Sequence, residues 1–178
     1  MLFRSRGAGI LSRKFDIPIY ANENTWSSME QEIGPVNIKN KMCFDNCKEF
    51  EIGNIFVKAF PIPHDASDPV GFNFFLDNKK ITTATDIGHM TNKLLSYLMG
   101  SDLLLIESNH DVEMLKVGPY PWQLKKRIMG ERGHLSNEMA GKVVAYLAKN
   151  GTKKFLLGHL SRENNFTELA YQTVCNVL

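Results

Sequence analysis

Residues 60–75 read FPIPHDASDPVGFNFF, and the interpretation of the whole chain starts from this stretch. Two apolar, extended segments flank a polar loop that carries His64, Asp65 and Asp68 between prolines. A loop that only had to reverse the chain would use Asn, Gly or Ser, which suit tight turns. His64 is therefore either a solvent-facing loop residue or a metal ligand whose partners lie elsewhere in the chain. Asp65 and Asp68 are candidates for orienting its ring through an N–H group, although Asp68, directly before Pro69, also suits a simple turn.

Size and composition indicate one domain over residues 1–178. A content of 43% hydrophobic and 22% charged residues is ordinary for a globular protein that buries a core. The net charge of +2 does not support nucleic-acid binding by overall charge alone. Cys43, Cys47 and Cys175 have neither disulfide nor complete zinc-site spacing, so we expect reduced thiols in a cytoplasmic protein. No apolar run reaches the ~20 residues of a membrane span, so no membrane association is expected.

Hydrophobic periodicity divides the chain into a hairpin-rich part and a part of alternating helices and strands. Gly53-Asn54 and Asp77-Asn78 mark two β-hairpin turns. The predicted strand regions are 17–22, 41–44, 49–62, 70–86, 101–108 and 153–160, and the predicted helices are 9–15, 23–34, 90–99, 121–129, 135–151 and 164–178. Hairpins followed by βα units predict an α/β fold with a mixed sheet and helices on its outer faces.

All five histidines come at the ends of predicted strands or helices. They are His64, His89, His110, His134 and His159. Asp86 and Glu107 end predicted strands in the same way. Loops at the strand ends of α/β sheets hold side chains in fixed positions, so functional residues gather there. A single histidine in such a place is more often structural or merely exposed, but five together favour a metal or acid–base site.

Competing catalytic motifs are weak. The chain has no G-x-S-x-G turn of a serine hydrolase and no phosphate-binding P-loop. GAGILS at residues 7–12 lacks the preceding strand and the third glycine of a dinucleotide loop. No cysteine adjoins a histidine in sequence, so a thiol nucleophile has no local support, while pairing in space stays open.

Six segments of the chain together resemble a known family. They are SRKFDIPIYANENTW (12–26), HDASDPVGF (64–72), TDIGHM (85–90), ESNHD (107–111), GHLSNEMA (133–140) and LGHLSRENN (157–165). In this order, across nearly the whole chain, they resemble the YycJ/WalJ-like branch of the metallo-β-lactamase-fold hydrolases. The resemblance implies an αββα sandwich with a two-metal site at one edge, formed by loops at the strand ends.

The resemblance also implies metal ligands. By motif, His64 corresponds to a ligand of one ion, His159 to a ligand of the other, and Asp86 to the aspartate that bridges both. Neutral imidazoles and a carboxylate suit Zn²⁺ or Mn²⁺. A pair of such ions lowers the pKa of a shared water and clamps the attacked phosphorus.

Further roles follow from the same resemblance. His134 corresponds to a histidine near the scissile phosphate, where it protonates the leaving oxygen. His110 is expected behind the ligands or beside the substrate, as are Asp111 and His89, with a structural capping role an equal alternative for each. Together with Asp86, the candidate catalytic residues are His134 and His110.

One departure from the family pattern changes the expectation. The family's H-x-H-x-D-H motif would lie just before RGAGILSRKF, but residues 1–9 read MLFRSRGAG, without histidine or acid. That motif supplies three histidine ligands and an aspartate, and the β-layer that precedes it is missing as well. We therefore expect a partial sandwich, equivalent to the C-terminal two-thirds of the family domain. We expect it to bind the two divalent ions weakly or not at all and to be inactive alone.

The expected function is that of a metal-dependent phosphodiesterase, with DNA as the substrate of exonuclease action. Lys125, Lys126, Arg127 and Arg162 are candidates for contacts to its phosphates. One alternative is a non-catalytic remnant or partner-binding fragment, which the missing motif favours. Another is a hydrolase of the same fold that acts on a small ester or thioester, because one fold hosts many reactions.

Overall fold

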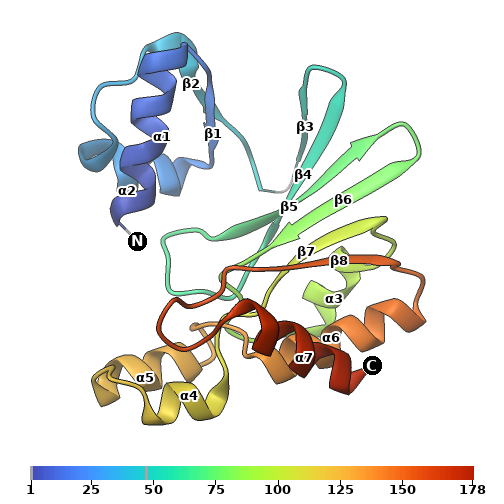
Figure 1. The fold of residues 1–178 in the computed structure, drawn as a ribbon. Coiled ribbons are helices and arrows are strands. Elements are labelled where there is room, and N and C mark those ends of the chain that lie inside the picture. The colour runs from blue at the N-terminus through green and yellow to red at the C-terminus, as the bar shows by residue number, and fades with distance from the viewer. Residues whose placement is uncertain (1, 47) are drawn as a thin grey trace.

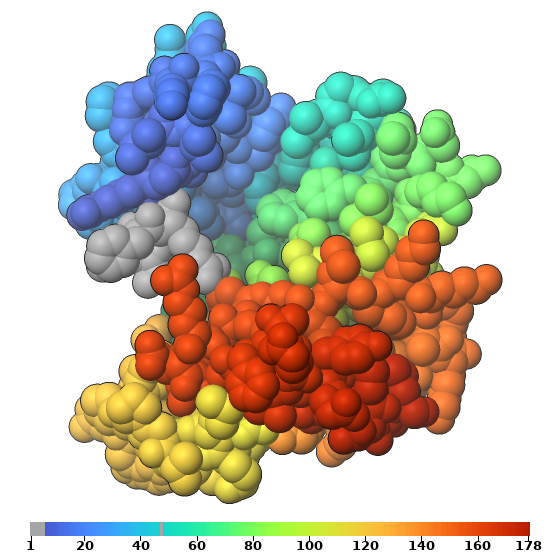
Figure 2. Space-filling view, viewed as in Figure 1, coloured from blue at the N-terminus to red at the C-terminus, as the bar shows by residue number. Residues whose placement is uncertain are grey.

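The computed structural model describes residues 2–46 and 48–178 (Figure 1). An N-terminal unit of two helices and two short strands stands beside a six-stranded sheet, and the remaining helices lie mainly below that sheet. In the space-filling view the N-terminal unit lies at the upper left and abuts the strands at the upper right, with the helical layer below (Figure 2). Within the described residues, no helix combines the length and apolar character of a membrane span.

The N-terminal unit is built around a small core of its own. It contains α1 (Leu2–Phe15), β1 (Ile19–Ala21), α2 (Glu23–Ile33), the 3-10 helix η1 (Ile38–Asn40) and β2 (Lys41–Cys43). Strands β1 and β2 pair in parallel, and Met29 and Ile33 of α2 are buried against Ala21 of β1. The Asn22 side chain caps α2 by accepting from the Thr25 backbone N–H at 2.9 Å. Helix α1 is longer than the predicted 9–15.

The large sheet has the strand order β3-β4-β5-β6-β7-β8. Its strands are β3 (Glu49–Ile52), β4 (Ile55–Pro61), β5 (Val70–Leu76), β6 (Lys79–Ala84), β7 (Leu103–Glu107) and β8 (Lys154–Gly158). The first four pair antiparallel, and β6, β7 and β8 run parallel. Gly53 and Asp77 turn the two hairpins with positive φ, as the Gly53-Asn54 and Asp77-Asn78 pairs predicted.

One face of the sheet is covered by helices and holds the main core. The helices of this part are α3 (Asn92–Leu98), α4 (Val112–Val117), α5 (Trp122–Met129), α6 (Asn137–Lys149) and α7 (Thr167–Val177). Leu98 of α3, Leu147 of α6 and Val174 of α7 belong to the same buried cluster as Ile106 of β7. Ser136 caps α6 by accepting from the Met139 N–H at 3.3 Å. The six-residue α4 was not predicted.

The opposite face of the sheet is also apolar, and among the described residues no comparable layer of helices covers it, although Phe44 packs edge-on against Phe72 of β5 there. The register pairs Ile81 with Leu103 and Leu105 with Leu156, and residues paired in this way share a face. Ile81 remains 43% exposed and Leu156 53% exposed. In the part of the chain that the structure describes, helices therefore pack as a layer on one face of the sheet, which is the arrangement predicted for a partial αββα sandwich.

Candidate metal centre

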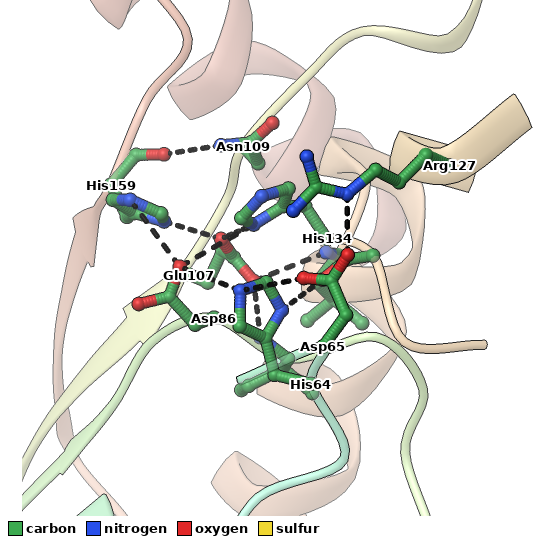
Figure 3. Close-up of polar contacts among 11 residues, drawn as sticks. His64, Asp65, Asp86, Glu107, Asn109, Arg127, His134 and His159 are labelled. Carbon is green, nitrogen blue, oxygen red and sulfur yellow. Dashed lines mark hydrogen bonds and ion pairs between the residues drawn. The ribbon is translucent and has the colours of Figure 1, made fainter. Parts of the chain in front are cut away.

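The sheet directs four chain segments to one edge. Strands β4 and β6 both run antiparallel to β5 and are therefore parallel to each other, and β7 and β8 follow β6 in parallel. All four consequently end at the same edge. His64 follows β4, Asp86 follows β6, Glu107 ends β7 and His159 follows β8. This topology explains why side chains far apart in sequence meet (Figure 3).

Asp86 lies at the centre of three imidazole rings. Its Oδ1 is 3.6 Å from Nε2 of His64 and 3.6 Å from Nε2 of His159. The third ring, His134 in the loop before α6, approaches the same oxygen through Nδ1 at 3.7 Å. The His134 ring centroid is 5.0 Å from that of His64 and 5.2 Å from that of His159. The structure therefore brings together His64, Asp86, His159 and His134.

Two of these residues sit at sharp bends of the backbone. Asp86 has φ 60° and His159 has φ 58°, so both occupy the left-handed region directly after a strand. Non-glycine residues are uncommon there, with aspartate and histidine among the better tolerated. At each bend the chain leaves the sheet, and the Asp86 and His159 side chains at the two bends face each other.

Glu107 is hydrogen-bonded to two of the imidazole rings, those of His134 and His159. Its side chain is fully buried, and Oε1 accepts from His134 Nδ1 at 2.8 Å and from His159 Nδ1 at 2.5 Å. Oε2 accepts from the backbone N–H of Ile87 at 2.6 Å and of Leu135 at 3.2 Å. Burial alone would raise the pKa of Glu107, but the hydrogen bonds from both histidines outweigh it and lower this pKa to about 2. The carboxyl is therefore ionised.

The hydrogen bonds fix which nitrogen of each ring carries the proton. An ionised carboxylate only accepts, so His134 and His159 must donate to Glu107 through Nδ1–H. His64 likewise donates from Nδ1 to the Gly133 carbonyl at 2.9 Å. In the neutral ring the unprotonated Nε2 atoms of His64 and His159 then face the Asp86 carboxylate, on the side where a cation would bind.

The donor set fits a divalent metal ion. One potential ligand atom from each of Asp86, Glu107, His134 and His159 lies within 4.8 Å of the others, and His64 adjoins Asp86. Imidazole and carboxylate ligands suit Zn²⁺ and Mn²⁺. Glu107 already accepts four hydrogen bonds, so its place is that of a carboxylate that orients the histidines rather than of a ligand.

The two aspartates of the His64 loop have separate roles. Asp65 Oδ1 lies 3.4 Å from His64 Nε2, while Oδ2 accepts from Arg127 Nε, whose hydrogen bond lowers the pKa of Asp65. Asp68 instead accepts from Asn46 at 2.9 Å and from Asn24 at 3.3 Å, which ties the loop to the N-terminal unit. The hypothesis that Asp68 orients the ring is therefore wrong. The ring N–H of His64 donates to the Gly133 carbonyl.

The remaining histidines lie farther from the cluster. His110 is 2% exposed, burial lowers its pKa, and its Nδ1 has no hydrogen-bond partner among the described residues. Asp111 caps α4 by accepting from the Met114 N–H at 2.8 Å, so of its two predicted roles the structure shows the structural capping role. His89 Nδ1 is hydrogen-bonded to the Glu131 carbonyl at 2.8 Å. A catalytic role for His110 stays a prediction.

Two cavities flank the cluster and share His64, Asp65 and Asp86 in their walls. One, of about 730 Å³, lies against the N-terminal unit and is lined by Tyr20 and Phe44 among others. The other, of about 600 Å³, is bounded by α5 and by the loop after β8 and includes the His134 and His159 side chains. A substrate in this second cavity, which we call the α5 cleft, would lie against the imidazole rings.

Two residues that position the site were not among the predicted site residues. Glu107 was recognised only as the end of a strand, and Asn109 was not singled out. Asn109 donates from Nδ2 to the His159 carbonyl at 2.8 Å and so holds the bend that carries His159. A signal for Glu107 exists in the sequence, because a carboxylate at the end of the apolar run LLLIE must be paired if it is buried.

Comparison with known proteins agrees with this geometry. The family described as "Beta-lactamase superfamily domain" matches residues 5–160. Exodeoxyribonuclease YycJ of Bacillus anthracis is 40% identical over 173 residues, which are 97% of this chain and 66% of the relative. Exodeoxyribonuclease WalJ of Streptococcus pneumoniae serotype 2 is 41% identical over 174 residues, 97% of this chain and 65% of the relative. The chain thus spans slightly less than two thirds of either length.

The fold likeness extends to solved structures. The metallo-β-lactamase fold protein YhfI from Bacillus subtilis superposes with a TM-score of 0.66 at 15% sequence identity. The alignment covers 90% of this chain and 59% of that one. At this identity the likeness concerns the fold alone.

Proposed function

The chain belongs to the beta-lactamase superfamily, and we propose that it serves metal-dependent hydrolysis of phosphodiesters, with DNA as the substrate and exonuclease action as the mode. The observation that carries the proposal is the convergence of two Nε2 atoms, from His64 and His159, on the Asp86 carboxylate at 3.6 Å. The names of the two relatives, both exodeoxyribonucleases, support DNA as the substrate class.

In this proposal His64, Asp86 and His159 would hold the metal. A divalent ion such as Zn²⁺ or Mn²⁺ bound there would supply an activated water and polarise a phosphoryl oxygen. Glu107 and the Gly133 carbonyl accept from Nδ1–H of the His159 and His64 rings, so Nε2 is the nitrogen that each ring turns toward the Asp86 carboxylate. Because the described ligands form only part of a two-ion shell, we propose that this chain alone does not hold two ions stoichiometrically.

His134 has a different orientation and a different proposed role. Its Nδ1 faces Glu107 and Asp86, so its Nε2 lies on the far side of the ring. His134 also lines the α5 cleft, where a substrate phosphate would lie. In its protonated form the ring can give its Nε2 proton to the leaving oxygen, while the Glu107 carboxylate stabilises the charged imidazolium.

The test combines metal-dependent DNA binding with a turnover assay. We expect a labelled single-stranded oligonucleotide to bind more tightly with Mn²⁺ or Zn²⁺ than with a chelator, and DNA degradation by the chain alone to stay near background. Asp86→Asn should abolish the metal-dependent part of binding. Asp77→Asn is the matched control, because Asp77 also has a positive φ but lies exposed at a hairpin tip.

The alternatives predict other results in the same assay. A non-catalytic, partner-binding fragment would bind neither metal nor DNA, and Asp86→Asn would change nothing. A hydrolase of small esters or thioesters would turn over a thioester in a metal-dependent way without binding the oligonucleotide. Metal-independent DNA binding that Asp86→Asn leaves intact would contradict the proposed role of the cluster.

A further inference from the structure

The α5 cleft brings two arginines beside the metal-binding cluster. Arg127 reaches it from α5 and Arg162 from the loop after β8, so the two come from different segments of the chain. Asp86, His134 and His159 line the same cleft. Two guanidinium groups are thus placed in the cavity in which a substrate phosphate would meet the cluster.

Arg127 is held so that part of its guanidinium stays available. Its Nε donates to Asp65, the residue next to His64. Within the described part of the chain, its Nη1 and Nη2 atoms make no hydrogen bond to protein, and the side chain is 62% exposed. A guanidinium fixed through Nε presents the Nη donors as a pair, a geometry that matches two oxygens of one phosphate.

Arg162 is also exposed, but its backbone is anchored. The preceding residue, Ser161, donates its N–H to the Asn109 carbonyl at 2.7 Å, and Ser161 Oγ accepts from the Asn164 N–H at 3.2 Å. Among the described residues Arg162 forms no ion pair, although Glu163 lies beside it in the cleft lining. A free arginine three residues after His159 can therefore turn toward an anion near the cluster.

The neighbouring lysines do not share this position. Lys125 is 8% exposed, and its Nζ donates to the Lys116 carbonyl at 2.7 Å, so the prediction of a phosphate contact for Lys125 is wrong. Lys126 Nζ lies 5.5 Å from the centroid of the Trp122 ring and is not part of the cleft. Of the basic run 125–127, only Arg127 faces the cleft.

We propose that Arg127 and Arg162 clamp a phosphate adjacent to the scissile one and so set the register of a nucleic-acid strand over the cluster. This inference rests on the proposed function, because it takes the substrate to be a phosphodiester chain. Asp65 acts as a positioning residue in the clamp. It tethers Arg127 and directly follows His64, a proposed metal ligand, in the chain.

The experiment compares charge-removing variants at the clamp with one outside it. Binding of a fluorescein-labelled single-stranded oligonucleotide with Mn²⁺ is followed by anisotropy over a salt series, for the unmodified chain, Arg127→Gln, Arg162→Gln, the double variant and Lys126→Gln. Each arginine variant should weaken binding, and the double variant should reduce the magnitude of the slope of log K against log salt by about 0.7, the value for one neutralised single-strand phosphate. Lys126→Gln should leave both unchanged.

Sequence independence gives a second readout. If the arginines contact phosphates, each arginine substitution should lower the affinity of the chain by the same factor for two oligonucleotides of unrelated sequence. Arg127→Lys should recover only part of the loss, because a lysine cannot present two parallel donors. Thermal unfolding of each variant checks that the fold is retained, and the exposed position of both arginines predicts little change.

The outcomes separate the clamp from the function on which it rests. If the unmodified chain binds DNA and both arginine variants bind equally well with an unchanged salt slope, the clamp is wrong and the proposed function stands. If the slope falls as much for Lys126→Gln as for Arg127→Gln, the binding follows bulk charge and the clamp is also overturned. If the unmodified chain binds no DNA, the proposed function fails together with the clamp.

Discussion

Glu107 and His159 lie 52 residues apart in the chain and are joined by a 2.5 Å hydrogen bond between Oε1 and Nδ1. The same oxygen accepts from His134 Nδ1 at 2.8 Å. One buried carboxylate therefore sets the orientation and the protonated nitrogen of two rings at once. The candidate metal centre depends on this residue, although Glu107 lines neither of the two cavities described above.

Glu107→Gln should weaken both the fold and the metal site. The neutral amide keeps the shape of the side chain, but it loses the charge that strengthens two buried hydrogen bonds. We expect the free energy of unfolding to fall by roughly 2–4 kcal/mol and zinc affinity by about 10–100-fold. Chemical denaturation and zinc titration measure the two effects.

The control for this substitution is Glu113→Gln. Glu113 pairs with Lys116 at 2.7 Å on the surface, and its side chain is 77% exposed. Removing such a pair should change the free energy of unfolding by less than about 1 kcal/mol. Equal effects of the two substitutions would contradict the role assigned to Glu107.

The contribution of Glu107 to stability should depend on acid pH. Its pKa is about 2 in the folded chain, below the ordinary 4.5, so the stabilisation is fully present above pH 4.5 and disappears as the pH falls toward 2. A shift of this size corresponds to roughly 3 kcal/mol. The difference in unfolding free energy between the unmodified chain and Glu107→Gln should therefore shrink over this interval.

Denaturation curves at several pH values between 2 and 6 measure that difference. The comparison cancels the titration of groups that both proteins share. A difference that stays constant down to pH 2 would mean that the carboxyl is not held ionised by the two histidines.

Metal binding by the chain should be weak and below two ions. His64, Asp86 and His159 offer two nitrogens and one carboxylate at the proposed site, fewer ligands than two tetrahedral ions require. After dialysis against buffer, elemental analysis should find less than two zinc or manganese ions per chain. Two tightly retained ions would refute the prediction. His159→Ala should lower the zinc affinity further, whereas His89→Ala should not.

Asp68→Ala should loosen the loop that carries His64. The Asp68 carboxylate accepts from Asn46 and Asn24, and the Asp68 backbone carbonyl accepts from Asn22. Loss of the two side-chain bonds should lower the free energy of unfolding by roughly 1–3 kcal/mol. Hydrogen exchange should accelerate in residues 64–69.

Asp68→Asn provides the comparison for this loop. The asparagine keeps one acceptor oxygen and the shape of the side chain, so exchange in residues 64–69 should lie between that of the unmodified chain and Asp68→Ala. Unchanged exchange in both variants would show that the N-terminal unit does not brace the loop.

The sequence predicted most of the fold and the centre of the site. Gly53-Asn54 and Asp77-Asn78 marked the hairpins because local turn chemistry suffices to place them. The six resembling segments identified the family, which the match over residues 5–160 confirms. His64, Asp86, His134 and His159 were named in advance, and the structure brings them together.

The features that escaped prediction depend on three-dimensional contacts. The importance of Glu107 follows from its bonds to rings 27 and 52 residues away, which no local pattern encodes. The Gly133 carbonyl that accepts from His64 is a backbone group, so no residue type in the sequence predicts this hydrogen bond. Lys125 belongs to a basic run expected at the surface, but its Nζ donates to the Lys116 backbone carbonyl and its aliphatic chain is buried. Helix α4 is too short for periodicity to reveal.

The left-handed backbone at Asp86 and His159 lowers the stability of the fold while it places two side chains of the candidate metal centre. A non-glycine residue in this region costs of order 1 kcal/mol or more, a penalty that glycine would not carry. His159 recovers this cost through its hydrogen bond to the buried Glu107 carboxylate. Selection of this chain for heat resistance alone would therefore be expected to replace residue 86 first, with glycine or asparagine as the favoured outcomes. Such a gain in thermal tolerance would remove the carboxylate on which the imidazole rings converge.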